Sequence, residues 1–143
     1  MEDPPLSSNF YLTHLEEGGD NEMNDLQGMD LSLSLLIGEE FTSQQPIGFW
    51  YYLLRKLPLI CGLVPLDPPI LFEFPSTQVP TESGVTGIMV MVQSHVAFHW
   101  WPESRFLHLT ISSCKQFNVD GVMGLLANLF PVKETHLEES RWS

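Results

Sequence analysis

Basic residues are scarce in this sequence, which has six lysines and arginines against 18 aspartates and glutamates, for a formal net charge of −12. Proteins that bind nucleic-acid backbones need basic patches, because phosphate contacts dominate their affinity. Eight of the acidic residues fall in residues 1–30, which contain no lysine or arginine, so the other 113 residues sum to only −4. The composition argues against a nucleic-acid partner and predicts a solvated acidic segment at the start of the chain.

Cysteines and long apolar runs are also scarce. Cys61 and Cys114 are the two cysteines, too few for the disulfide framework of a small secreted domain. The most apolar window, residues 47–64, is interrupted by two basic residues and a proline, so it is a poor membrane span. The N-terminus lacks the basic and apolar regions of a signal peptide. We therefore expect a cytoplasmic protein without a membrane partner.

The hydrophobic pattern predicts one folded domain over residues 30–143, preceded by a mostly disordered acidic extension over residues 1–29. Alternating or continuous apolar runs predict strands at 30–37, 70–74, 84–92, 95–101, 106–114 and 132–138, and helical spacing predicts helices at 47–57 and 122–130. This order predicts an α+β fold, a two-layer sandwich of a mainly antiparallel sheet with two helices on one face. Two local expectations follow: Pro58 should end or kink the first helix, and the apolar strand 84–92 should be buried on both faces.

Polar groups that could carry chemistry lie on strands in residues 84–114. An unpaired buried polar group costs about 1–3 kcal/mol, so their placement is informative. His95 and His99 could share a metal ion on a helix, but on a strand residues four apart are about 13 Å apart. We therefore predict no metal site. No Gly-x-Ser-x-Gly nucleophile turn is present either. From these residues alone, a polar core satisfied by hydrogen bonds and a catalytic cluster both remain open.

A longer motif favours the catalytic cluster over the satisfied polar core. It consists of Gly84-Val85-Thr86-Gly87, Ser94-His95, His99, Trp101-Pro102-Glu103 and Cys114. This motif resembles that of the short prokaryotic-type S-adenosylmethionine decarboxylases, which are pyruvoyl-dependent enzymes that make their own cofactor by self-cleavage. The resemblance is strongest over residues 84–115, and the order of elements from residue 30 onward is similar to the family's sandwich, whereas residues 1–29 have no counterpart.

The resemblance implies that the chain is a zymogen cleaved at the Gln93–Ser94 bond. Ser94 would become a pyruvoyl group, and the products would be a β chain of residues 1–93 and an α chain of residues 94–143. The pyruvoyl ketone would form a Schiff base with the amine of S-adenosylmethionine and accept electrons as carbon dioxide leaves. The product would be the aminopropyl donor for spermidine biosynthesis.

The resemblance also implies roles for other residues of the site. These are His99 as the base in self-cleavage, Thr86 as a hydroxyl that assists it, Cys114 as the acid that reprotonates the carbanion, Glu103 as a carboxylate for the ribose hydroxyls, and Phe74, or else Phe72, as a ring stacked on adenine.

Hairpin geometry predicts that these residues cannot form one site within one chain. If the strands pair as expected, Thr86 lies opposite His99 and Ser94 lies opposite Cys114. The two couples are then five residues apart along one strand, which is about 16 Å. A second copy related by a twofold axis could complete the site, so we predict a homodimer with two shared active sites.

The sequence departs from the family at three positions. Gln93 stands where the family has glutamate, Thr86 where serine is usual, and Lys115 where glycine is usual. These departures keep two alternatives open: a non-processing, catalytically silent homologue that acts as a binding or regulatory subunit, and a same-family arginine or ornithine decarboxylase.

Overall fold

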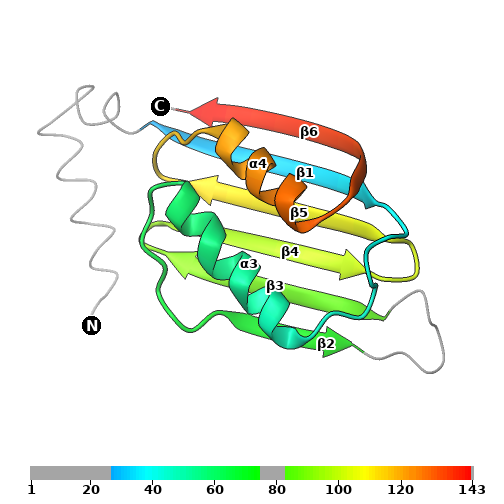
Figure 1. Cartoon of the computed structure of the whole chain (residues 1–143). Coiled ribbons are helices and arrows are strands. Elements are labelled where there is room, and N and C mark those ends of the chain that lie inside the picture. Colours follow the sequence, from blue (N-terminus) through cyan, green and yellow to red (C-terminus); the bar gives the residue numbers. More distant parts are fainter. Residues whose placement is uncertain (1–26, 75–82, 143) are drawn as a thin grey trace, which may run out of the picture.

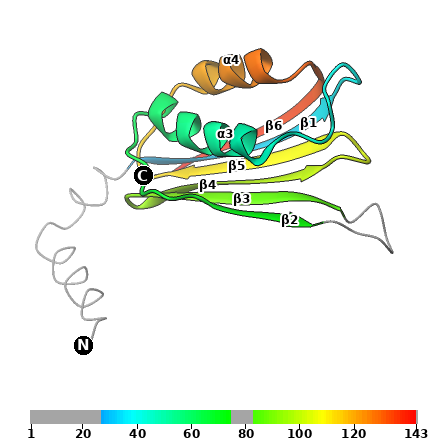
Figure 2. The same ribbon diagram turned by 60° about the horizontal axis from the view of Figure 1, so that its bottom comes forward.

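A six-stranded antiparallel sheet forms the centre of the fold in the computed structural model, which describes residues 27–74 and 83–142 (Figure 1). The strands are β1 (Gly28–Ile37), β2 (Ile70–Phe74), β3 (Gly84–Met91), β4 (Ser94–Trp101), β5 (Phe106–Ser113) and β6 (Val132–Trp142), and the helices are α3 (Ile47–Ile60) and α4 (Val119–Leu129). The strand order is β2-β3-β4-β5-β1-β6, and both helices cover one face of the sheet (Figure 2). The predicted two-layer α+β sandwich is confirmed.

Side chains alternate between a face covered by the helices and an open face. Leu31, Leu33 and Leu35 of β1 are fully buried on the covered face, and the serines between them point the other way. Strand β1 begins at Gly28, two residues before the expected start, because Met29 continues the same buried row. The rest of the extension that was expected to be disordered, residues 1–26, lies outside the described part of the chain.

Helix α3 packs on the sheet through a buried stripe of Trp50, Leu53, Leu54 and Leu57. The expectation that the helix would end at Pro58 is corrected, since α3 continues to Ile60. Pro58 lies in the last turn and is itself buried, so the hydrogen bond that it cannot donate is offset by packing. The chain leaves the helix at Gly62, whose positive φ of 75° suits a residue without a side chain.

Helix α4 starts three residues earlier than expected. Asn118 caps it, with Oδ1 accepting a hydrogen bond from the backbone N–H of Asp120 at 2.9 Å. The helix ends at Leu129, just before Pro131. Neither helix in the described part of the chain is long and apolar enough to cross a membrane.

Strand β3 corrects a second expectation. Its residues alternate between buried and more exposed positions, so the strand is buried on one face rather than on both. Ile88 is half-buried and Val90 is 46% exposed, both on the open face. The apolar run therefore gives the open face of the sheet an apolar surface.

Candidate active site

The turn between β3 and β4 carries the proposed cleavage bond. Met91 pairs with Ser94, which leaves Val92 and Gln93 as a two-residue turn. Gln93 has a φ of 59°, a left-handed conformation that costs a residue with a side chain roughly 1–2 kcal/mol. A left-handed second turn residue is usually glycine or asparagine. Strain is therefore present at the residue whose carbonyl group precedes Ser94.

Ser94 lies on the covered face and is only 8% exposed. Its Oγ accepts a hydrogen bond from the backbone N–H of Cys114 at 2.9 Å, and Cys114 Sγ lies 3.8 Å from the carbonyl oxygen of Val92. We call Gln93, Ser94 and Cys114 the Ser94 half-site. One detail of the expected pairing is corrected, because His95 pairs with Ser112 and the register therefore aligns Ser94 with Ser113. Cys114 is the next residue, directly after the end of β5, and its backbone N–H donates to the serine.

A second set of candidate site residues lies on the open face. Thr86 pairs with His99, as expected, and Thr86 Oγ1 lies 2.8 Å from His99 Nδ1. A cavity of about 260 Å³ lies beside them and is also lined by Phe74 and Trp101. Phe72 is on the same face of β2 but does not line this cavity. We call these four lining residues the His99 half-site.

The two half-sites are separate within one chain. Ser94 and His99 are five residues apart on β4, about 16 Å along the strand. Because five is odd, their side chains also point to opposite faces of the sheet, which the burial pattern of β4 bears out. Thr86 and His99 therefore cannot reach Ser94 of the same chain.

Glu103 lies in the turn between β4 and β5, where it is exposed. It does not line the cavity of the His99 half-site. The turn is held by Arg105, whose φ of 52° is also left-handed. The Arg105 guanidinium donates to the carbonyl oxygen of Gly38 at 2.6 Å and also bonds the carbonyl of Phe41. This clamp ties the turn to the loop after β1 and offsets the backbone strain.

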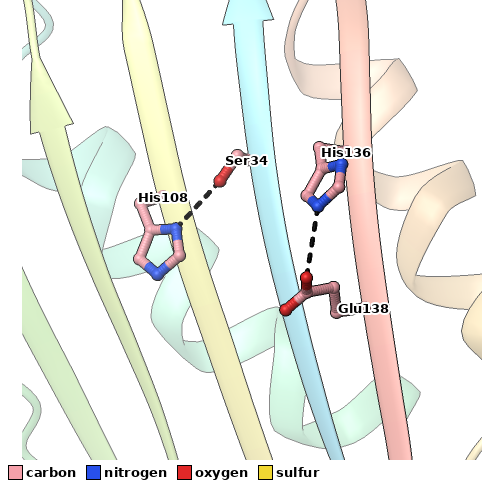
Figure 3. A network of polar contacts seen from close by, with 4 residues as sticks. All are labelled: Ser34, His108, His136 and Glu138. Carbon is pink, nitrogen blue, oxygen red and sulfur yellow. Dashed lines mark hydrogen bonds and ion pairs between the residues drawn. The ribbon is translucent and has the colours of Figure 1, made fainter.

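The sequence argument missed His108, which pairs directly with His99 across β4 and β5. His108 Nδ1 lies 3.1 Å from Ser34 Oγ of β1, and Figure 3 shows the two side chains pointing toward one another on the open face. The same view shows His136 beside Glu138 on β6, 3.4 Å apart. The expected register, with Ser94 opposite Cys114, would place Leu109 opposite His99, so the sequence pattern held no signal that located His108 there.

The two cysteines differ in environment. Cys61 is 4% exposed, and burial raises the pKa of its thiol from 9.0 to about 11. A buried neutral thiol is a packing residue rather than a nucleophile. Cys114 is half-buried and lies at the Ser94 half-site.

Comparisons with known proteins agree with this architecture. Residues 53–141 match the pattern of the family described as S-adenosylmethionine decarboxylase. A segment of 58 residues is 28% identical to the S-adenosylmethionine decarboxylase proenzyme of Thermococcus kodakarensis; it covers 40% of this chain and 41% of that relative, less than half of its length. The fold matches the crystal structure of the adenosylmethionine decarboxylase from Aquifex aeolicus with a TM-score of 0.60 and 15% identity, over 80% of this chain and 88% of that one. On the family match, the chain belongs to the S-adenosylmethionine decarboxylase family.

Proposed function

We propose that this protein is a self-cleaving, pyruvoyl-dependent decarboxylase of S-adenosylmethionine. The observation that carries the proposal is the position of Ser94, which follows a left-handed Gln93 and holds the backbone N–H of Cys114 at 2.9 Å. A serine hydroxyl, a strained preceding residue and a thiol are thereby gathered at one turn. These are the groups that the chemistry requires.

Cleavage begins when Ser94 Oγ attacks the carbonyl carbon of Gln93 and the peptide nitrogen leaves, which converts the amide into an ester. Strain at Gln93 raises the energy of the uncleaved turn and so favours this step. Elimination of the ester then breaks the bond between Ser94 Oγ and its Cβ and frees the carboxylate of Gln93. Hydrolysis of the dehydroalanine that remains releases ammonia and leaves residue 94 at the new N-terminus.

The surroundings of Ser94 fit a pyruvoyl group. Because Oγ leaves with the carboxylate of Gln93, the N–H of Cys114 that now bonds Ser94 Oγ becomes available as a donor to a nearby carbonyl oxygen of the new group. When formed, such a group supplies a carbonyl that links to the substrate amine and stabilises negative charge as carbon dioxide leaves. In this proposal Cys114 Sγ returns a proton to the substrate carbon.

His99 provides the base for cleavage in this proposal, and Thr86 orients its ring through Nδ1. Since neither residue reaches Ser94 of its own chain, a second copy of the chain must supply them. We therefore propose a homodimer in which each active site combines the Ser94 half-site of one chain with the His99 half-site of the other. The open face of β3 is apolar at Ile88 and Val90, which favours burial against a partner. Because Ser94 points to the covered face, the partner's His99 would have to approach it from the end of the β3–β4 hairpin.

Binding of the substrate involves Phe74 and Glu103 in the same proposal. Phe74 is 47% exposed and belongs to the His99 half-site, where its ring is available for stacking on adenine. Glu103, on the adjoining turn, offers a carboxylate for the ribose hydroxyls. The decarboxylated product would serve as the aminopropyl donor for spermidine.

Intact-mass spectrometry of the purified full-length chain tests the proposal. We expect two fragments, residues 1–93 and residues 94–143, the second with a blocked N-terminus that carries the mass of a pyruvoyl group. The cleaved protein should release carbon dioxide from S-adenosylmethionine but not from arginine or ornithine. A chain that stays uncut after long incubation would instead support the silent homologue, and release from arginine or ornithine would support the alternative decarboxylase.

A further inference from the structure

The turn between β3 and β4 has a backbone shape that does not suit a hairpin. Of its two residues, Val92 and Gln93, both of which the structure describes, only Gln93 has a positive φ. A two-residue hairpin turn follows the twist of its strands when the first residue, or both residues, have a positive φ, and other turn types splay the strands. A strained conformation persists only where the surrounding structure holds it. The ends of β3 and β4 are therefore expected to be restrained from outside the hairpin.

On the β4 side, the restraint is the end of β5. The backbone N–H of Cys114 donates to Ser94 Oγ at 2.9 Å, and Cys114 Sγ lies 3.8 Å from the carbonyl oxygen of Val92. These contacts hold the start of β4 and the first residue of the turn. They leave the outer edge of β3 to be held by another segment.

On the β3 side, the restraint is a short segment between α3 and β2. Strand β2 pairs with β3 as far as Ile88. Beyond that point Pro65 forms an isolated antiparallel bridge with Met91, and the backbone N–H of Leu66 donates to the carbonyl oxygen of Val90 at 2.8 Å. We call Pro65 and Leu66 the strap. In Figure 1 the chain that carries it runs from α3 to β2 past the end of β3.

The strap is anchored on both sides. Before it, Leu63 is buried in the core, and its backbone N–H donates to the carbonyl oxygen of Pro58 at 2.8 Å. After it, Asp67 forms an exposed ion pair with Arg55 of α3, with 2.9 Å between Oδ1 and Nε. Leu66 itself is 48% exposed, so its side chain adds little packing. The contribution of Leu66 to the end of β3 is therefore made by its backbone N–H.

We propose that the strap is a positioning element for self-cleavage. The hydrogen bond from the Leu66 N–H to Val90 holds the end of β3, so Gln93 cannot leave its left-handed conformation by a shift of the hairpin end. The carbonyl carbon of Gln93 then stays where Ser94 Oγ can attack it. This inference rests on the proposed function for the cleavage itself, whereas the restraint on the turn is also present in a chain that cannot cleave.

Two substitutions of Leu66 test the strap in the full-length chain. Leu66→Pro removes the N–H, whereas Leu66→Ala removes most of the side chain and keeps the N–H. Excess hydroxylamine attacks the ester between Ser94 Oγ and the Gln93 carbonyl, which leaves a hydroxamate on residue 93 and an α chain that begins with serine. Intact mass then reports ester formation alone, and the rate is divided by the folded fraction from circular dichroism.

The two substitutions should differ strongly in rate. We expect Leu66→Pro to slow ester formation by about 10–100-fold, because the reacting carbonyl group is no longer held in place. Leu66→Ala should stay within about threefold of the natural sequence, as an exposed side chain outside the site. A loss of stability alone would not produce this difference, since the rate refers to folded protein.

Amide hydrogen exchange in the Ser94→Ala chain tests the restraint without cleavage. We expect the Leu66 amide to exchange at least about tenfold more slowly than an exposed amide. Leu66→Pro, but not Leu66→Ala, should speed exchange at residues 91–93 by about tenfold.

Three outcomes would overturn the inference: an unprotected Leu66 amide, ester formation in folded Leu66→Pro at the rate of Leu66→Ala, or equal exchange at residues 91–93 in the two variants. If Leu66→Pro fails to fold, protection of the Leu66 amide in the Ser94→Ala chain decides alone. A natural sequence that forms no ester would reject the proposed cleavage, and amide exchange would then decide whether the strap restrains the turn.

Discussion

Thr86 and His99 are hydrogen-bonded across β3 and β4, with Oγ1 2.8 Å from Nδ1, on the face of the sheet opposite Ser94. The bond fixes the orientation of the imidazole, and in the tautomer in which Nδ1–H donates to Thr86 Oγ1 it leaves Nε2 as the nitrogen that takes up a proton. The base proposed for self-cleavage is thus oriented in each chain, but it is oriented away from that chain's own serine.

Removal of the Thr86 hydroxyl should slow self-cleavage, because the His99 ring loses the bond that orients it. We expect Thr86→Ala to lower the rate on the order of tenfold and Thr86→Ser to restore it. His99→Ala should lower it by about 10²–10⁴, the usual contribution of a general base. Time courses of intact mass measure these rates. Thr110→Ala, a threonine on the open face of β5, is the matched control, and a Thr86→Ala chain that cleaves at the parental rate would contradict the assigned role.

Strain at Gln93 should lower the free energy of unfolding, and substitutions at this position can measure it. In the uncleavable Ser94→Ala background, Gln93→Gly should change the free energy of unfolding by between zero and about +1 kcal/mol, since relief of the left-handed conformation is partly offset by chain entropy. Gln93→Val should lower it by more than about 1 kcal/mol, because a β-branched residue tolerates this conformation worst. Urea unfolding provides the values. Equal stability of the two variants would show that the turn is not strained.

The hydrogen bonds and the positive φ of Arg105 predict that a glycine replacement is more stable than an alanine replacement. Arg105→Ala removes the charged hydrogen bonds to the loop after β1 but keeps a side chain at a positive φ, so it should destabilise the fold by about 2–3 kcal/mol. Arg105→Gly removes the same bonds but relieves the strain, so it should cost about 1 kcal/mol less. Thermal and urea unfolding test this order. If alanine is the more stable replacement, the positive φ carries no strain.

Burial of Cys61 predicts a loss of stability at alkaline pH. The folded thiol has a pKa raised to about 11, whereas the unfolded thiol ionises near 9.0. Between these values the unfolded chain releases a proton that the folded chain keeps, so the free energy of unfolding falls as pH rises from about 9 toward 11, by up to roughly 2–3 kcal/mol. Unfolding curves at several pH values measure the slope. A Cys61→Ala variant should lose this component, and an identical slope in both proteins would refute it.

The order of elements and much of the site were predictable from the sequence because local signals agreed with the fold. Alternation of leucine and serine located β1, and hairpin counting located Thr86 opposite His99. The burial of β3 was not predictable, because an apolar run does not reveal whether a partner or the helices cover the second face. The pairing of Ser94 with Cys114 was one residue out of register, because the turn between Trp101 and Phe106 has an even number of residues whereas that pairing needs an odd number.

The structure added one finding that matters most for the site, namely which face of the sheet the helices cover at each residue of β4. Spacing along the strand predicted a separation of about 16 Å between Ser94 and His99 and, because five is odd, opposite faces for their side chains. The burial pattern was needed to show that the helices cover the face of Ser94 and leave that of His99 open.

Co-expression of two inactive variants tests the shared site most directly. The His99→Ala chain keeps an intact Ser94 half-site, and the Ser94→Ala chain keeps an intact His99 half-site. We predict that each variant alone stays uncut or nearly so, and that in the mixture intact-mass spectrometry finds cleavage of the His99→Ala chain and none of the Ser94→Ala chain. A His99→Ala chain that stays uncut in the mixed dimer, while the natural sequence cleaves, would contradict an active site built from two chains.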